Sequence, residues 1–178
     1  SKISLPALYL TLSIMLSPSA FAATAVGTET VLKGYFGVNL HMDNCCDGNY
    51  ADVNNVISQL KYIGVRRARD WATRDDVISK WQTINLATGI VFHAPIPQAS
   101  PKEQRIALDR IQGWVKKYPK LIDVIEGSNE PDTEYPASQG ASLVDSTNLQ
   151  PQVYTIGQNL GIPVAQLSVG SGWHAPLW

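Results

Sequence analysis

The sequence predicts an α/β fold in which short strands alternate with helices around a parallel sheet. Five runs of β-branched or aliphatic residues recur about thirty residues apart, which is the length of one strand, one helix and two loops. Between these runs, apolar residues recur at the spacing of an amphipathic helix. The two patterns together indicate consecutive βα units.

The five expected strands are short and rich in aliphatic side chains, as strands of a buried parallel sheet are. Their ranges are Gly34–Leu40, Val65–Arg69, Gly89–His93, Leu121–Ile125 and Pro163–Val169.

Two of the four expected helices have clear boundary signals. The first should end at Gly64, because glycine readily takes the left-handed conformation that closes a helix. The third should begin at Ser100, with Pro101 in the first turn and Glu103 three residues after the capping serine. Their apolar faces are Val53, Val56, Ile57, Leu60 and Ile63 in the first helix, and Ile106, Ile111, Trp114, Val115 and Tyr118 in the third.

The other two helices have weaker signals. Thr73 is expected to cap the second helix, whose apolar positions are Val77, Ile78, Trp81 and Ile84. The fourth is expected from about Gln152 to Gly161. A long loop rich in Ser, Pro, Asp and Thr, over Pro131–Asn148, should precede it.

Residues 1–22 have the order of a secretory signal peptide. Lys2 precedes the apolar run Leu5–Leu16, and the small residues of Ala20-Phe21-Ala22 suit a signal peptidase. The run is shorter than the ~20 residues that a membrane-spanning helix needs, so a membrane anchor is the weaker interpretation. We expect cleavage near Ala22 and a single domain over residues 23–178, without a membrane segment, that is secreted or periplasmic.

Composition excludes several other classes of function. A net charge of −1 provides no basic surface for a nucleic acid. The only cysteines, Cys45 and Cys46, are adjacent, which leaves open a vicinal disulfide, an intermolecular bridge or free thiols. His41 and Asp43 lie near them, but the spacing fits no zinc pattern, so no metal site is expected.

Periodicity alone does not distinguish an open doubly wound sheet from a barrel. No glycine-rich phosphate loop follows the first strand, which weakens a nucleotide-binding sheet. Polar residues instead follow the expected strands at their C-terminal ends, where (β/α) barrels of the TIM type carry their catalytic groups. These residues are His41 and Asp43, Arg69 and Asp70, His93, Asn129 and Glu130, and Ser171–His174. Their distribution favours the barrel.

The strongest local motif is the run Ile125–Pro131, in which a glutamate and an asparagine follow a buried strand. A glycosidic bond needs a positioned acid to protonate its leaving oxygen, and Glu130 is placed to be that acid. Strict alternation would put Glu126, Ser128 and Glu130 on one face and Asn129 on the other. Asn129 then shares the site only if the strand bulges or has ended, which Gly127 permits.

Asn129-Glu130-Pro131 resembles the acid/base motif on the fourth strand of clan A of the glycoside hydrolases, retaining enzymes with an eightfold (β/α) barrel. On the second strand, Gly64–Arg69 is similar to the clan's Gly-x-x-x-x-Arg, and the resemblance extends from about Gly34 to the end of the chain. It implies that Glu130 is the general acid/base and that Asn129 holds the 2-hydroxyl of the sugar. It also implies that Arg69 orients the nucleophile, and that the substrate is a carbohydrate.

Three further residues are expected to bind sugar, although no motif identifies them. His41, His93 and Trp173 carry rings at expected strand ends, and such rings pack against the C–H face of a sugar. The alternatives are a hydrogen-bonded core histidine for His93 and a barrel-wall residue for Trp173. Arg69 and Asp70 could likewise form a structural ion pair. No cofactor is expected, since two carboxylates and water suffice for glycoside hydrolysis.

The chain is shorter than the family it resembles. Such a barrel has eight strands and typically ~250 residues, whereas removing residues 1–22 from the 178 leaves 156. We therefore expect about five of the eight βα units, and a chain that is inactive by itself because the clan's nucleophile is a glutamate on the seventh strand. No residue here is assigned that role.

Two other functions remain open. The first is a non-catalytic secreted carbohydrate-binding or host-interaction protein on a degenerate barrel, in which Trp71, Trp173 and Trp178 contact the glycan. The second is an unrelated exported α/β protein in which Asn129-Glu130-Pro131 is only the turn that ends a strand. A large separation between Glu130 and Arg69 would favour the latter.

The signal peptide generates the first prediction. Protein exported by the native source is expected to begin at Ala23, because Ala20 and Ala22 provide the small side chains that the peptidase accepts. N-terminal sequencing of the exported fraction measures this directly. Exported protein that still carries Lys2 would contradict it.

Overall fold

Five parallel strands form one sheet in the computed structural model of the chain, in the order β1-β2-β3-β4-β5. The structure describes residues 34, 36–43, 48–72, 74–132, 143–168 and 170, so the expected signal peptide lies outside the described residues. Each strand pairs in parallel with the next one along the chain. The strands are β1 (Gly37–Asn39), β2 (Arg67–Arg69), β3 (Val91–Ile96), β4 (Ile122–Ser128) and β5 (Val164–Ala165).

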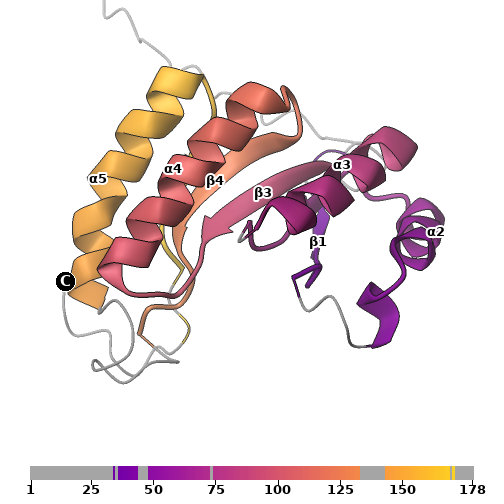
Figure 1. Cartoon of the computed structure of the whole chain (residues 1–178), viewed down its shortest axis with the longest axis horizontal. Helices are drawn as coiled ribbons and strands as arrows, with labels where there is room; N and C mark the ends of the chain where they lie inside the picture. The colour runs from indigo at the N-terminus through magenta and orange to yellow at the C-terminus, as the bar shows by residue number, and fades with distance from the viewer. Residues whose placement is uncertain are drawn as a thin grey trace, which may run out of the picture.

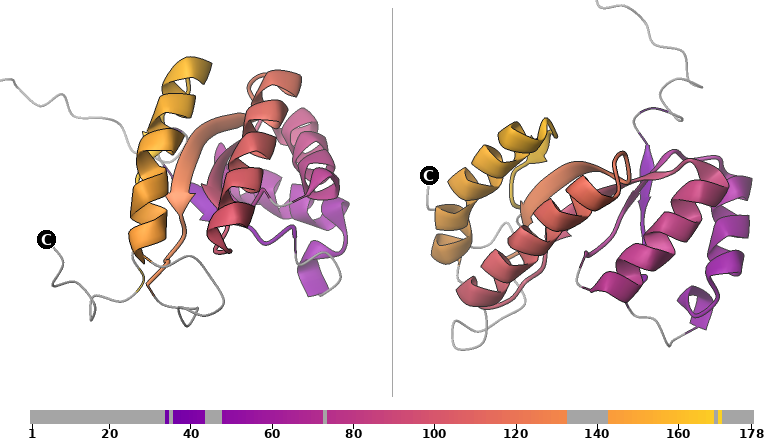
Figure 2. Two further views of the ribbon diagram at one scale, coloured as in Figure 1. Left: turned by 60° about the vertical axis from the view of Figure 1, so that its left-hand side comes forward. Right: turned by 45° about the horizontal axis from the view of Figure 1, so that its top comes forward.

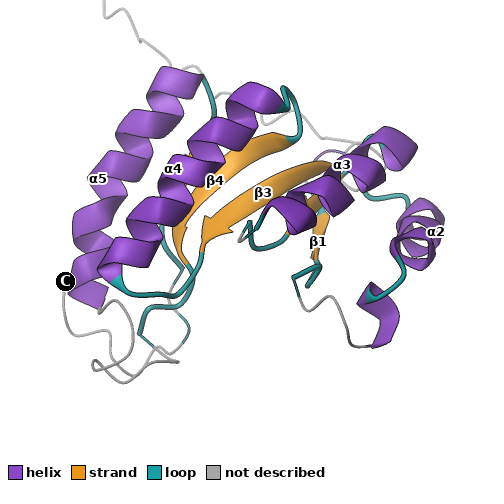
Figure 3. Cartoon of the chain, viewed as in Figure 1, coloured by secondary structure: helices purple, strands orange, loops and turns teal. Residues whose placement is uncertain are grey.

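Helices alternate with the strands, which confirms the α/β class (Figure 3). Helices α3, α4 and α5 lie side by side on the same face of the sheet (Figure 1), and the rotated views in Figure 2 agree. Within the described segments, no helix has the length and apolar character needed to cross a membrane. The helical elements are η1 (Gly48–Tyr50), α2 (Val53–Ile63), α3 (Asp75–Thr88), α4 (Pro101–Lys117) and α5 (Leu143–Leu160).

The core lies between the sheet and these helices. Ile90 and the alternate residues of β3, Phe92, Ala94 and Ile96, are fully buried. Phe92 stacks on Trp81 of α3 with ring centroids 4.4 Å apart and planes inclined by 3°. Because side chains alternate along a strand, His93 points to the opposite face. The sheet therefore has one apolar face under the helices and one face available for polar groups.

The expected boundary signals of α2 and α4 are confirmed. Gly64 ends α2 with φ of 76°, and its N–H donates to the Leu60 carbonyl 3.0 Å away. At the start of α4, Ser100 and Glu103 form a reciprocal capping box with Pro101 in the first turn. Both ends satisfy backbone groups that a helix otherwise leaves unpaired.

Two expected helix starts are wrong. Helix α3 begins at Asp75 with Arg74 at the cap position, rather than being capped by Thr73. Asp75 and Asp76 stabilise this end through the helix dipole instead. Helix α5 begins at Leu143, well before Gln152, and continues through Pro151. A helix tolerates this proline when tertiary packing outweighs its missing N–H, and Leu149 and Val153 on either side of it are buried.

The apolar face predicted for α4 contains one error. Ile106 is 41% exposed, whereas Leu108 and Ile111 are buried. Two residues along a helix turn the side chain by about 200°, so Ile106 and Leu108 cannot share a face. The buried face therefore passes through Gln104, Leu108, Ile111 and Trp114.

Strand β4 contains an extra residue at Gly127. Opposite it, Pro95 pairs with Glu126 and Ile96 pairs with Ser128, so Gly127 has no partner on β3. This bulge reverses the alternation that follows it. Ser128 faces the helices, where its hydroxyl accepts a hydrogen bond of 2.9 Å from Gln104 of α4. Placing Ser128 on the same face as Glu126 was therefore wrong, and the bulge that Asn129 required is present.

The bulge generates the second prediction. A Cβ atom at residue 127 would lie 2.8 Å from the backbone nitrogen of Leu167 and would also collide with Gln150. Gly127→Ala is therefore expected to lower the free energy of unfolding by about 1–3 kcal/mol, the usual effect of overpacking. Urea denaturation of the purified chain measures the change.

The matched control is Gly113→Ala in the middle of α4, where a new Cβ meets nothing within 4 Å. It should raise the free energy of unfolding by about 0.5–1 kcal/mol, because alanine favours a helix more than glycine does. Equal effects of the two substitutions would show that residue 127 is not tightly packed.

Candidate functional site

An ion pair between the second and fourth strands forms the centre of the polar face. Arg69, the last residue of β2, donates through Nε to Glu126 Oε2 at 2.7 Å and through Nη2 to Glu126 Oε1 at 2.8 Å. Glu126 lies on β4 and is only 5% exposed. Because β3 separates the two strands, this bidentate contact spans the middle of the sheet. Such a pair fixes the orientation of both side chains.

His93 of β3 lies between these two residues. It is paired in register with Arg69, and its Nε2 lies 2.9 Å from Glu126 Oε2, although the two groups are not aligned as a hydrogen bond. Burial raises the pKa of Glu126, but Arg69 and His93 outweigh this effect and lower it to about 2. Glu126 is therefore a carboxylate at every physiological pH.

Asn129 joins the same group from the end of β4. Its Oδ1 accepts a hydrogen bond from Arg69 Nη2 at 2.7 Å and one from the Ser168 hydroxyl at 3.1 Å. Its backbone N–H donates to the Ile96 carbonyl at 3.3 Å, so β3 also holds it. The structure thus brings Asn129, Arg69 and His93, three of the expected site residues, into one cluster with Glu126.

Glu130 follows Asn129 in a left-handed conformation, with φ of 40°. Its backbone is held on both sides: the N–H donates to Ser168 Oγ at 3.2 Å, and the carbonyl accepts from Gln98 Nε2 at 2.7 Å. The hydrogen bond to Glu126 raises the pKa of Arg69, and the charge of Glu130 adds to this increase. The negative charge of Glu130 therefore acts on Arg69.

Asp70 is not the partner of Arg69, so the alternative of a structural ion pair between them is wrong. Its side chain lies on the helix side of the sheet and is 2% exposed. It accepts hydrogen bonds from Trp81 Nε1 at 2.7 Å, from the Trp71 N–H at 2.9 Å, and from the Met42 N–H at 3.2 Å. Burial is the largest influence and raises the pKa of Asp70 to about 7. Asp70 joins the segments after β1 and β2 to α3.

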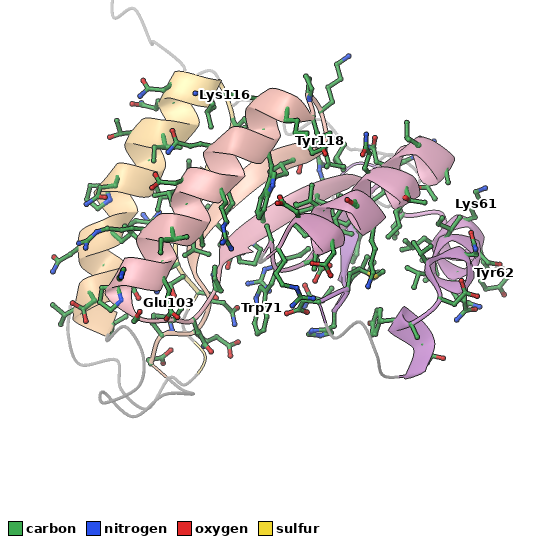
Figure 4. All side chains as sticks on the ribbon, viewed as in Figure 1. Lys61, Tyr62, Trp71, Glu103, Lys116 and Tyr118 are labelled. Atoms are coloured by element: carbon green, nitrogen blue, oxygen red, sulfur yellow. The ribbon has the colours of Figure 1, made fainter. Side chains whose placement is uncertain are left out.

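His41 lies in a separate aromatic group beyond the ends of β1 and β2. Its ring meets Tyr50 and Trp71 edge-on, at centroid distances of 6.0 and 6.3 Å. Figure 4 labels Trp71 beyond the sheet, at the same end of the molecule as Glu103 in the first turn of α4. This is the end at which parallel strands present their C-terminal residues. Trp173, Cys45 and Cys46 lie outside the described residues.

The expected strand ends were only partly right. His93 lies in the middle of β3 rather than at its end, because the strand continues to Ile96. Glu126, Ser168 and Gln98 belong to the cluster and were not among the predicted site residues. The position of Glu126 four residues before Glu130 was a usable signal. For Ser168 and Gln98 the sequence offers none, since their contacts depend on how β5 and β3 flank β4.

The described residues show two further features that bear on ligands. A hollow of about 490 Å³ lies between β1, η1 and α2 and is lined by residues such as Leu40, Tyr50 and Leu60, so it is separate from the Arg69–Glu126 pair. In the described ranges, no three His, Cys, Asp or Glu side chains converge as ligands for a metal ion.

Comparison of the chain with models of known protein families, with curated protein sequences and with solved structures found no significant match. The chemical interpretation of the cluster therefore depends on its own geometry.

The two perturbed carboxylates generate the third prediction. Glu126 has a pKa of about 2 in the fold and an ordinary value of 4.5, so it stabilises the fold above pH 4.5 and loses this contribution as pH falls through 2. The difference corresponds to about 3 kcal/mol. The difference in unfolding free energy between the wild type and Glu126→Gln should therefore become smaller as the pH is lowered from 4.5 to about 2.

Asp70 should act in the opposite direction. Its pKa of about 7 in the fold exceeds the ordinary 3.8, so between these values the folded chain keeps a proton that the unfolded chain releases. Stability therefore falls as pH rises from 3.8 to 7, by at most about 4 kcal/mol, and Asp70→Asn should remove this slope. Urea denaturation at a series of pH values measures both effects. A slope that persists in Asp70→Asn would contradict the assignment.

Proposed function

We propose that the protein is a secreted retaining glycoside hydrolase of the (β/α)-barrel type, acting on a β-glycoside or a polysaccharide, with Glu130 as general acid/base. The observation that carries the proposal is the contact between the end of β4 and the end of β2. Asn129 accepts a hydrogen bond from Arg69, and Glu130 is the next residue along the chain, at the C-terminal edge of the sheet.

The arrangement of the sheet supports a barrel over a doubly wound fold. The strand order follows the chain without reversal, so the described strands have no topological switch point at which a doubly wound sheet binds its ligand. Helices α3, α4 and α5 cover one face only (Figure 2). In a barrel that face is the outside, and the cluster around Arg69 would then lie inside the mouth.

The chemistry follows from the donors and acceptors in this cluster. Glu130 would give its proton to the glycosidic oxygen as the bond to the anomeric carbon breaks, and would later accept a proton from the water that attacks the same carbon. The oxygen of Asn129 already accepts two hydrogen bonds, so its amide nitrogen is the group left to donate to a sugar hydroxyl.

The nucleophile would be a second carboxylate about 5–5.5 Å from the acid/base. Glu126 does not suit that role, because Arg69 engages both of its oxygens and it is almost fully buried. We assign Glu126 the role of orienting the Arg69 side chain. The Nη1 group of Arg69 makes no hydrogen bond to a described residue, and it could orient a further carboxylate. We assign no nucleophile among the described residues.

A second candidate is a secreted carbohydrate-binding protein without catalysis. The edge-on group of His41, Tyr50 and Trp71 favours it, because aromatic rings beyond the strand ends provide a surface for a sugar. Both candidates require export, which residues 1–22 support through their charge, apolar run and small residues. Turnover of a glycoside distinguishes the hydrolase from the binding protein.

Glu130→Gln provides the fourth prediction. In the protein purified from its native source, it should lower the rate on 4-nitrophenyl β-glycosides about 10²–10⁴-fold, the usual contribution of a general acid. With 2,4-dinitrophenyl β-glycosides, whose leaving group departs without a proton, the first step should be much less affected. Azide, which needs no general base, should restore turnover and yield a glycosyl azide of retained configuration.

The matched control is Glu103→Gln, which replaces an exposed carboxylate in the capping box of α4. A capping box accepts glutamine in place of glutamate, so the helix should be unaffected. Its rates should equal those of the wild type. Glycan binding by both the wild type and Glu130→Gln, with no turnover by either, would favour the binding protein. Equal turnover by the wild type and Glu130→Gln would reject Glu130 as the acid/base.

A further inference from the structure

Ser168 lies where three strands converge on the Asn129-Glu130 dipeptide. It follows β5, and its backbone N–H donates to the Ser128 carbonyl at 3.2 Å, which extends the pairing of β5 with β4. Its hydroxyl then makes two contacts with the dipeptide. It donates to Asn129 Oδ1 at 3.1 Å and accepts from the Glu130 N–H at 3.2 Å.

The first contact fixes which way the Asn129 amide points. Arg69 has donors only, so the Asn129 atom that it contacts must be the oxygen. The Ser168 hydroxyl occupies the second acceptor position of that oxygen. With both positions filled, rotating the amide by half a turn would place its NH₂ group against the guanidinium. The NH₂ group is therefore held away from Arg69.

The second contact stabilises the left-handed backbone of Glu130. A residue other than glycine avoids positive φ, so a φ of 40° persists only where neighbouring groups enforce it. Gln98 holds the Glu130 carbonyl from the β3 side, and Ser168 holds the N–H from the β5 side. The segments that follow the two strands flanking β4 thus each contribute one side chain to the peptide that carries the proposed acid/base.

We infer that Ser168 is a positioning residue: one hydroxyl fixes both the Asn129 amide that meets the sugar and the backbone that aims the Glu130 carboxyl. The inference rests on the proposed function for its catalytic consequence, and on the hydrogen bonds alone for its structural one. It extends the site to the segment that follows the fifth strand, for which the sequence motifs gave no residue.

The variants are Ser168→Ala, which removes the hydroxyl, and Ser168→Thr, which keeps it. Thr155→Ala is the control, because the Thr155 hydroxyl bonds only to the Pro151 carbonyl of its own helix. In the natural protein, Ser168→Ala should lower kcat on 4-nitrophenyl β-glycosides about 10–100-fold, as expected for losing two hydrogen bonds, with a smaller change in KM. Ser168→Thr should restore kcat to within about threefold, since a hydroxyl contributes one such bond in each direction. Thr155→Ala should leave it unchanged.

A second measurement does not depend on turnover. Hydrogen exchange of the Glu130 amide, followed by NMR in this chain, should accelerate about tenfold or more in Ser168→Ala and not in Ser168→Thr, because only the former removes its acceptor. The Phe92 amide, bonded to the Leu121 carbonyl at the other end of the sheet, serves as the internal reference.

The two measurements separate the two proposals. Accelerated exchange together with a kcat loss that threonine reverses would support the inference. Unchanged exchange in Ser168→Ala, or a kcat equal to that of Thr155→Ala, would overturn it. A wild-type protein that turns over no glycoside, while Ser168→Ala still accelerates exchange, would reject the proposed function and the catalytic consequence, and would support the structural role of Ser168.

Discussion

The candidate site depends on the extra residue at Gly127 in β4. From Val124 to Glu126 the side chains alternate, and Glu126 faces Arg69. After Gly127 the alternation is reversed, so Ser128 packs towards α4 and Asn129 returns to the face of Glu126. Without the bulge, Asn129 would point into the helices and Arg69 would lose one of its acceptors. The absence of a side chain at Gly127 leaves the room in which Gln150 and Leu167 pack.

Around this bulge, charge is concentrated on one face of the sheet. Arg69, His93 and Glu126 come from three successive strands, and the parallel register brings Arg69 and His93 each to within 3 Å of a Glu126 oxygen. The opposite face has an apolar core in which Phe92 and Trp81 stack, and its buried polar groups, such as Asp70 and Ser128, are hydrogen-bonded to the helices. The sheet therefore separates two tasks: packing stabilises the fold from the helix side, and the opposite side carries the polar groups to which we assign the proposed function.

The order of strands and helices could be predicted from the sequence, because the repeating βα pattern and the helix caps at Gly64 and Ser100 are local signals. A motif identified Asn129 and Glu130 as candidates, and simple alternation showed that Asn129 needs a bulge to reach the face of Glu126. The start of α5 could not be predicted, since Pro151 normally ends a helix and only tertiary packing overrides it. Ser168 could not be predicted from the sequence either, because its contacts arise only when β3, β4 and β5 come together in space.

The left-handed backbone at Glu130 has an evolutionary consequence. At a position with φ of 40°, glycine would relieve a local strain of about 1–2 kcal/mol, but it would remove the carboxyl group. Under the proposed function, selection for a more stable fold and selection for the Glu130 carboxylate oppose each other at this single residue. On the same proposal, related chains without the activity would be free to acquire glycine here, so the residue at this position would distinguish chains that keep the activity from chains that have lost it.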